Sequence, residues 1–147
     1  MKLVVQRVSS ASVEVDGEIT GQIDEGLMVL VGFGVNDTTK EADYLAKKLV
    51  KLRVFPDENA RMNKSVRDVG GKLLLVPQFT LYASTKKNRP SFHKSLNPDD
   101  ATALFDYFTE QCGQYVGVET GVFGAFMKVN LLNNGPVTIL LEKEFSD

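Results

Sequence analysis

The segment from residue 27 to residue 33 constrains the fold more than any other part of this chain. It reads LMVLVGF, an apolar run without a polar side chain. A strand with one solvent-exposed face alternates apolar and polar residues, whereas an uninterrupted apolar run of this length is typical of a strand buried on both faces. We therefore expect a sheet that holds this strand in its interior.

Alternation and turn residues mark the other strands. Val13 and Val15 alternate with polar neighbours, and the Asp16-Gly17 pair that follows predicts a tight hairpin, because glycine accepts the positive φ of a type I′ turn. Residues 56–71 are polar and predict a loop with room for a short hairpin. The expected strands are 3–8, 11–15, 18–23, 27–33, 53–55, 72–76, 115–120, 125–132 and 137–143.

Two amphipathic helices are expected between these strands. Thr38 and Glu41 have the spacing of a capping box, in which each satisfies a free backbone N–H of the other. Asn97 and Pro98 start the second helix as N-cap and first helical residue. The buried stripes are expected to be Ala42, Leu45, Ala46 and Leu49 in the first helix, opposite Lys47, Lys48 and Lys51, and Ala101, Leu104, Phe105 and Phe108 in the second.

These elements predict one α/β domain over residues 1–147, of the α+β kind, with both helices on one face of the sheet. A chain of 147 residues buries a core without disulfides or metals, and its single Cys112 cannot form an internal disulfide. One unpaired cysteine favours the reducing cytoplasm, and no apolar stretch is long enough to span a membrane. The net charge of −2 argues against a protein that coats nucleic acid, but not against one that grips an RNA end with a local patch.

Ordinary catalytic side chains are scarce. His93 is the only histidine, so the chain has no HExxH motif and cannot build a histidine-rich zinc site. No P-loop and no dinucleotide-binding glycine motif occurs, and a serine triad would have to use His93. We therefore expect no metal and no cofactor, and a site built mainly from the backbone.

Two short motifs are candidates for such a site. Gln78-Phe79-Thr80-Leu81 follows an expected strand, and the segment 133–138 contains the pair Gly135-Pro136. Taken alone, Thr80 reads as an ordinary strand residue and Gly135-Pro136 as a turn. Between them, residues 84–94 carry four Lys/Arg, no acid, one phenylalanine and one histidine, a composition that suits phosphates and an unpaired base but also fits a solvated loop.

Together, the two motifs resemble the D-aminoacyl-tRNA deacylase family, also called D-tyrosyl-tRNA deacylases. The resemblance extends over the chain, through residues 6–8 near the start and Arg89-Pro90-Ser91-Phe92 in the basic loop. It implies a fold of mixed, largely antiparallel, barrel-like β layers under two helices, and a homodimer that needs no metal. It also implies hydrolysis of the ester of D-aminoacyl-tRNA, and of glycine mischarged on tRNA-Ala, as chiral proofreading in the cytoplasm.

The resemblance also assigns roles to single residues. It places Gln78, Phe79 and Thr80 on one wall of the aminoacyl pocket as the catalytic segment. Gly135-Pro136 would be a cis dipeptide that enters the pocket of the other subunit, reads the α-amino group and excludes L side chains, and Arg7 would orient it. Phe92 and Arg89 would lie near the terminal adenosine.

One residue departs from the family pattern. A serine usually precedes the Gln-Phe-Thr-Leu core, whereas this chain has Pro77, which lacks a backbone N–H. We expect this change to be tolerated if the working donors are the amides of residues 78–80. An aminoacyl ester is already activated, so positioning and N–H donors to an oxyanion suffice for its hydrolysis. Two other functions stay open at this point, a non-catalytic RNA-end binding module and a small-molecule esterase.

Overall fold

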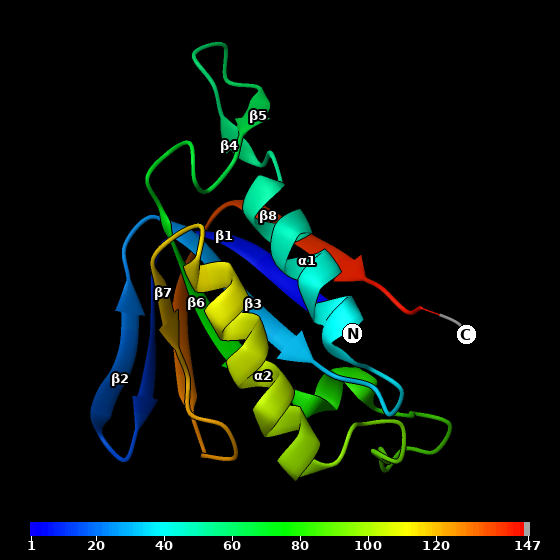
Figure 1. Cartoon of the computed structure of the whole chain (residues 1–147). Coiled ribbons are helices and arrows are strands. Elements are labelled where there is room, and N and C mark those ends of the chain that lie inside the picture. The colour runs from blue at the N-terminus through cyan, green and yellow to red at the C-terminus, as the bar shows by residue number, and fades with distance from the viewer. Residues whose placement is uncertain (146–147) are drawn as a thin grey trace.

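The computed structural model describes residues 1–145 and shows a curled, mostly antiparallel sheet covered on one face by two helices (Figure 1). The main sheet contains β1 (Lys2–Val15), β2 (Glu18–Ile23), β3 (Gly26–Gly32), β6 (Lys72–Pro77), β7 (Val118–Thr120) and β8 (Lys128–Glu142). A separate hairpin pairs β4 (Phe55–Pro56) with β5 (Met62–Lys64). Within residues 1–145, no helix is long and apolar enough to cross a membrane.

The apolar run does form an interior strand. β3 pairs antiparallel with β1 on one edge and parallel with β6 on the other, and all of its residues but Leu30 are buried. The sheet runs in the order β2-β1-β3-β6-β7, and β8 pairs with the opposite edge of β1. β2 then curls back to β7, where a Cβ on Gly21 would lie 2.6 Å from the Thr120 carbonyl oxygen, so the sheet is nearly closed into a barrel.

Both helices form as the sequence predicts. α1 (Thr39–Lys51) has the Thr38–Glu41 capping box, and α2 (Pro98–Gly113) has Asn97 as N-cap with Pro98 in its first turn. Every residue of the two expected stripes is buried, and Lys47, Lys48 and Lys51 are exposed. The stripes pack on one face of the sheet and share a core with Leu3, Val5, Val29, Leu73 and Leu75.

A second, smaller core lies on the other face, inside the curl of the sheet. It contains Val8, Val13, Ile23, Met28 and Leu74, with Ala11 and Val76. Alternate residues of β1, β3 and β6 therefore enter different cores, because successive side chains of a strand point to opposite faces. This two-sided burial explains why residues 27–33 tolerate no polar side chain.

The strand predictions fail in four places. Residues 115–117 lie between α2 and β7 and belong to no strand, since β7 begins only at Val118. Residues 3–8 and 11–15 belong to one strand, β1, and residues 125–132 and 137–143 mostly belong to one strand, β8. The long ladder between β1 and β8 carries both strands through the residues that look like turns. Residues 53 and 54 are not in a strand, and β4 begins only at Phe55.

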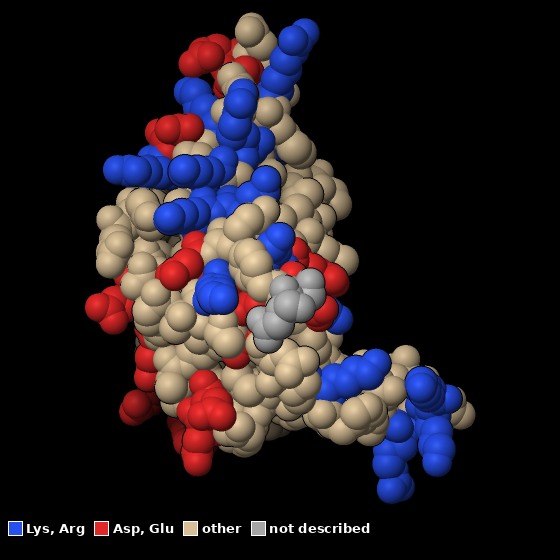
Figure 2. Space-filling view, turned by 45° about the vertical axis from the view of Figure 1, so that its right-hand side comes forward, with Lys and Arg blue, Asp and Glu red and all other residues tan. Residues whose placement is uncertain are grey.

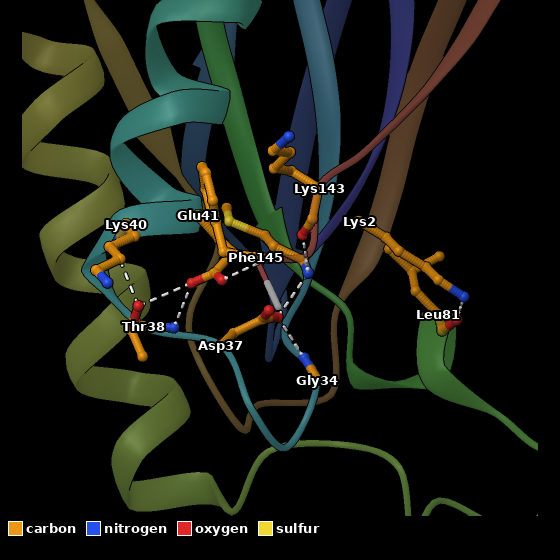
Figure 3. A network of polar contacts seen from close by, with 10 residues as sticks. Lys2, Gly34, Asp37, Thr38, Lys40, Glu41, Leu81, Lys143 and Phe145 are labelled. Atoms are coloured by element: carbon orange, nitrogen blue, oxygen red, sulfur yellow. Dashed lines mark hydrogen bonds and ion pairs between the residues drawn. The ribbon is translucent and has the colours of Figure 1, made fainter. Parts of the chain in front are cut away.

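A polar network holds the start of β1. The Met1 amino group is buried, lies 2.7 Å from a carboxylate oxygen of Asp37, and donates to the Lys143 carbonyl at 3.0 Å. The same Asp37 oxygen accepts from the Gly34 amide at 2.6 Å, and Glu41 accepts from the amides of Thr38 and Phe145 (Figure 3). The network fixes β1 against the loop that follows β3.

Candidate active site

The Gln78-Phe79-Thr80-Leu81 motif forms a 3-10 turn rather than a strand. β6 ends at Pro77, and η1 spans Phe79–Tyr82. The turn packs tightly on the end of β3, where a Cβ on Gly32 would lie 2.9 Å from Leu81 Cβ and 3.0 Å from the Gln78 carbonyl oxygen. Glycine at position 32 is therefore needed for the turn to approach the strand this closely.

The turn leaves two backbone donors available. The Gln78 amide donates to the Val31 carbonyl at 2.8 Å, so the expectation that residues 78–80 all offer free amides is wrong for residue 78. The Phe79 and Thr80 amides precede the first hydrogen bond of the turn, and neither has an acceptor among residues 1–145. These two donors belong to consecutive residues, and both residues are exposed, Phe79 by 55%.

The Thr80 hydroxyl is engaged by its neighbour. The side-chain amide of Gln78 donates a hydrogen bond to Thr80 Oγ1. No histidine or carboxylate of the described chain hydrogen-bonds to this hydroxyl, so the contacts show no base that would activate it. The geometry favours the backbone of Thr80 over its side chain.

Pro77 removes no hydrogen bond of the sheet. In a parallel strand the N–H groups of successive residues point to opposite neighbours. The Gln78 amide points to β3, so position 77 points toward β7, whose pairing with β6 ends at Leu75 and Thr120. A residue without an N–H therefore fits here, as proline fits where strand pairing has ended.

The basic loop folds back onto the motif. Ser84 and Ser91 exchange two backbone hydrogen bonds, of 2.8 and 3.0 Å, which close the loop between them. Phe92 thereby packs edge-on against Phe79 with ring centroids 5.0 Å apart. The structure thus brings Gln78, Phe79, Thr80 and Phe92 together. Arg89, by contrast, lies at the exposed tip of the loop.

Gly135-Pro136 is a cis peptide within a bulge of β8. Two residue steps along β1, from Gln6 to Val8, are matched by five along β8, from Thr138 to Asn133, so the dipeptide protrudes opposite Arg7. Arg7 Nε donates to the Asn134 carbonyl at 2.8 Å, and its Nη1 donates to the Val54 carbonyl at 2.6 Å. Arg7 therefore ties the bulge to the start of the β4–β5 hairpin.

Asn133 is a structural partner of the bulge, and the sequence interpretation, although it included this residue in the motif 133–138, assigned it no role. Its side-chain amide accepts from the Val137 amide at 2.8 Å and donates to the Val137 carbonyl at 3.2 Å. It replaces the pairing that the bulge removes from the ladder. An asparagine four residues before the strand resumes is the available sequence signal, because such side chains readily bond nearby backbone groups.

The two motifs do not meet within one chain. Lys2 Nζ lies 3.5 Å from the Leu81 carbonyl, so the turn sits at the start of β1, whereas the bulge sits at Arg7. Five residues of strand separate these positions, roughly 16 Å at ~3.3 Å per residue. Both motifs are exposed, the turn at the start of β1 and the bulge near its middle.

Similarity to known proteins agrees with this arrangement. The family model described as D-Tyr-tRNA(Tyr) deacylase matches residues 4–142. The solved structure of a c-Myc DNA Unwinding Element Binding Protein is 42% identical over 99% of this chain and 100% of its own, with a TM-score of 0.94. A second solved structure, of a probable eukaryotic D-amino acid tRNA deacylase, shares the fold at 18% identity, with a TM-score of 0.80 over 95% of this chain and 97% of its own.

The family match covers both motifs, Arg7 and the basic loop. The β sheet curled under two helices is also the fold of the deacylase structure. The chain therefore belongs to the D-Tyr-tRNA(Tyr) deacylase family, and as a member it is a D-aminoacyl-tRNA deacylase.

Proposed function

We propose that the chain hydrolyses the ester between a D-amino acid and the terminal adenosine of tRNA in a pocket that two copies complete. The observation that carries the proposal is the separation of the two motifs, because the positions beside which they lie, Lys2 and Arg7, are roughly 16 Å apart along β1 at ~3.3 Å per residue. A second copy supplies the missing wall. Phe79, Thr80 and Phe92 of one subunit then face Gly135-Pro136 of the other.

The reaction needs little beyond positioning. Water attacks the ester carbonyl carbon, and the developing oxyanion accepts hydrogen bonds from the Phe79 and Thr80 amides. The bond to the ribose oxygen then breaks, and that oxygen takes up the proton released from the water, assisted by the neighbouring 2′-hydroxyl. Removing one oxyanion donor typically costs about 10²–10³ in rate, so two backbone donors are a sufficient catalytic device for an activated ester.

Chirality is selected by exclusion. The carbonyls of Gly135 and Pro136 accept from the α-amino group of the substrate, and this orientation directs an L side chain into the wall. A clash discriminates between enantiomers better than an added contact does. Glycine has no side chain to clash, so the same filter admits glycyl-tRNA, including glycine mischarged on tRNA-Ala.

The free edge of β8 is the proposed dimer surface. β8 pairs only with β1 among the described strands, so its outer edge carries unpaired backbone groups. Leu132 and Leu140 are 61% and 67% exposed on this strand. A long edge strand with exposed leucines invites pairing with another chain. The proposed substrate also assigns the enzyme to the cytoplasm, where aminoacyl-tRNA is used.

Paired D- and L-aminoacyl-tRNA substrates test the proposal. We expect rapid hydrolysis of the D-aminoacyl ester and no hydrolysis of the L-aminoacyl ester above background. Equal rates for both substrates would contradict the proposed exclusion of L-aminoacyl groups. A lack of turnover of either would remove the reaction itself.

Thr80→Ala tests which part of Thr80 acts. The variant keeps the backbone amide, so we expect its kcat to stay within about threefold of the wild-type value, well short of the ~10²–10³ loss of an oxyanion donor. Complete loss of activity in a folded variant, checked by circular dichroism, would assign the role to the hydroxyl.

Nucleic-acid binding without turnover is the second candidate, favoured by the 42% identity to the c-Myc DNA Unwinding Element Binding Protein. In that case the basic loop grips an RNA or DNA end and the turn has no chemical role. Reversing the charge of Lys86, Lys87 and Arg89 weakens binding in both cases. Only the deacylase releases free amino acid, which thin-layer chromatography of the labelled product detects.

A further inference from the structure

A basic surface remains that the proposed pocket does not use. It comprises the second half of α1 and the segment that carries the β4–β5 hairpin, and we call it the hairpin patch. Figure 2 shows Lys and Arg gathered over these elements, apart from the second basic group on the projecting loop. Its cations are Lys47, Lys48, Lys51, Arg53, Arg61, Lys64 and Arg67.

Local structure does not account for this concentration of charge. Cations in the last turn of α1 suit the helix dipole, which explains Lys48 and Lys51 but none of the hairpin residues. In the described chain only Lys64 of this set forms an ion pair, with Glu58 at 3.2 Å. Seven cations face four nearby carboxylates in a chain of net charge −2, so the patch is a local exception. Those carboxylates are Asp43, Asp57, Glu58 and Asp68.

The acidic neighbours are mostly committed to local bonds. Asp43 accepts from the Tyr107 hydroxyl at 2.6 Å, and Asp68 accepts from the Ser65 amide at 2.9 Å. Asp57 accepts from the Asn59 and Arg61 amides, which lower its pKa. Arg53 bonds Asn63 and Lys64 pairs with Glu58, but the other five cations have no hydrogen-bond or ion-pair partner among residues 1–145. A hollow of about 530 Å³ lies among the side chains of Tyr44, Lys47, Lys48, Lys51 and Arg53, with Asp43 and Leu52.

The position of the patch is fixed relative to the bulge. Arg7 bonds both the Asn134 carbonyl and the Val54 carbonyl, so Gly135-Pro136 lies beside the start of the hairpin. A subunit that inserts this dipeptide into a neighbouring pocket therefore brings its hairpin patch to the rim of that pocket. The neighbour's own loop 84–94, with four further cations, lies beside the same pocket at Phe79 and Phe92.

We propose that the hairpin patch binds the sugar–phosphate backbone of the acceptor stem of a tRNA whose aminoacyl end lies in the other subunit's pocket. The inference rests on the proposed function and adds the surface that holds the rest of the substrate. Lysines and arginines on an exposed surface suit phosphates, which position a nucleic acid without reading its sequence. Double-stranded RNA is recognised mainly through its shape and backbone, so the patch would not distinguish tRNA sequences.

Charge reversal on α1 provides the first test. Lys47 and Lys51 are four residues apart on one face of the helix, and we compare Lys47→Glu/Lys51→Glu with the matched control Lys40→Glu/Lys72→Glu. Both pairs change the net charge by the same amount at exposed positions, but the control pair lies outside the patch. The neutral pair Lys47→Gln/Lys51→Gln serves if the reversed pair folds poorly.

The readout is the ratio of kcat/KM for D-aminoacyl-tRNA to that for D-aminoacyl-adenosine, which has no stem. We expect the patch variant to lower this ratio about tenfold or more through KM, and to reduce the slope of log KM against log salt by about 2, since each phosphate contact contributes about 1. The control should keep the wild-type ratio. If the patch variant has wild-type activity on D-aminoacyl-adenosine and an unchanged ratio, the proposed role of the hairpin patch is refuted, while the deacylase function stands.

Mixed dimers test whether the patch serves the neighbouring site. One dimer combines a Phe79→Pro chain, which lacks the backbone N–H of residue 79 and so loses one of the two proposed oxyanion donors, with a Lys47→Glu/Lys51→Glu chain, so its only intact pocket faces a wild-type patch. The other combines wild type with a chain that carries all three changes, so its only intact pocket faces the altered patch. We expect the first dimer to retain half of the wild-type activity on tRNA and the second to lose it. The reverse order would show that each patch serves its own pocket, which contradicts the proposal.

Discussion

The two motifs, the turn at the start of β1 and the bulge near its middle, are held in different ways. The turn at 78–81 is fixed by the body of the protein, through the Gln78 amide bond to Val31 and the close fit over Gly32. The bulge at 134–136 lies on an edge strand and is held by two side chains, Arg7 and Asn133. One motif belongs to the core scaffold, and the other is presented outward. This difference is what a site shared between two subunits requires.

The largest effect is expected on β8, which carries the Gly135-Pro136 bulge and is the proposed dimer surface. Leu132→Asp/Leu140→Asp places two charges on the exposed face of β8, so the dimer should dissociate and deacylation should fall to background. Because both leucines are exposed, the stability of the monomer should change by only about 0.5 kcal/mol per site. Light scattering with activity assays at matched concentration measures both.

Ile19→Asp is the matched control, because Ile19 is 54% exposed on β2 rather than on β8. It should stay dimeric and active. A monomeric but fully active leucine variant would refute the shared site.

Arg7→Ala should have the next largest effect. It removes two charge-assisted hydrogen bonds that hold the bulge, each worth about 1.5–3 kcal/mol. We expect kcat/KM for D-aminoacyl-tRNA to fall at least ~10-fold, since ~1.4 kcal/mol corresponds to a factor of ten.

Arg7→Lys keeps the charge but not the two-pronged geometry, so it should recover only part of the activity. Crystallography of the variant shows whether the bulge has moved. Wild-type kinetics in Arg7→Ala would mean that the bulge keeps its position without the Arg7 hydrogen bonds.

Gly135→Ala should have a smaller effect at the same motif. Gly135 has a φ of +153°, and an added Cβ would meet Val137 Cγ2 at 2.8 Å and Arg7 Nη2 at 3.2 Å. We expect a loss of about 1–3 kcal/mol in stability from the strained backbone, with a roughly tenfold loss of activity as the bulge shifts. Gly17→Ala also changes a glycine of positive φ, +82°, but with no atom within 4 Å of the new Cβ, so it should lose stability but not activity. Urea unfolding and initial rates separate the two outcomes.

Glu41→Gln tests the polar network at the start of β1, where we expect a change in stability rather than in activity. Burial opposes ionisation of Glu41, but the hydrogen bonds from Thr38 and Phe145 outweigh it and hold its pKa below the usual value. A lowered folded pKa gives stability that is present above the unfolded pKa, about 4.3, and is lost as the pH falls through the folded value. We expect Glu41→Gln to be less stable at neutral pH by about 1 kcal/mol and equal to wild type in acid. Thermal unfolding between pH 7 and pH 3 measures this, and a constant difference would contradict it.

Local sequence patterns correctly predicted the elements whose first or last residues carry a capping or turn motif. The capping box at Thr38, the proline after Asn97 and the Asp16-Gly17 turn each stabilise a boundary through neighbouring residues, so they predict α1, α2 and the β1–β2 hairpin. Asp16 and Gly17 both have positive φ, as the turn type requires. The same logic failed at Gly135-Pro136, because a proline in a sequence predicts the end of a strand, whereas β8 pairs with the same strand β1 on both sides of the bulge.

The sequence by itself determined the chemistry available and the family, because both depend on which residues are present. It identified Gln78, Phe79, Thr80, Arg7, Phe92, Arg89 and the Gly135-Pro136 pair as the candidates, and only the family resemblance implied which of them lie together. Tertiary structure decided that the Val31 carbonyl occupies the Gln78 amide, that Arg7 ties the bulge to Val54, and that the turn lies at the start of β1 while the bulge lies near its middle. These facts depend on pairing between residues far apart in the chain, and no local pattern encodes such distances.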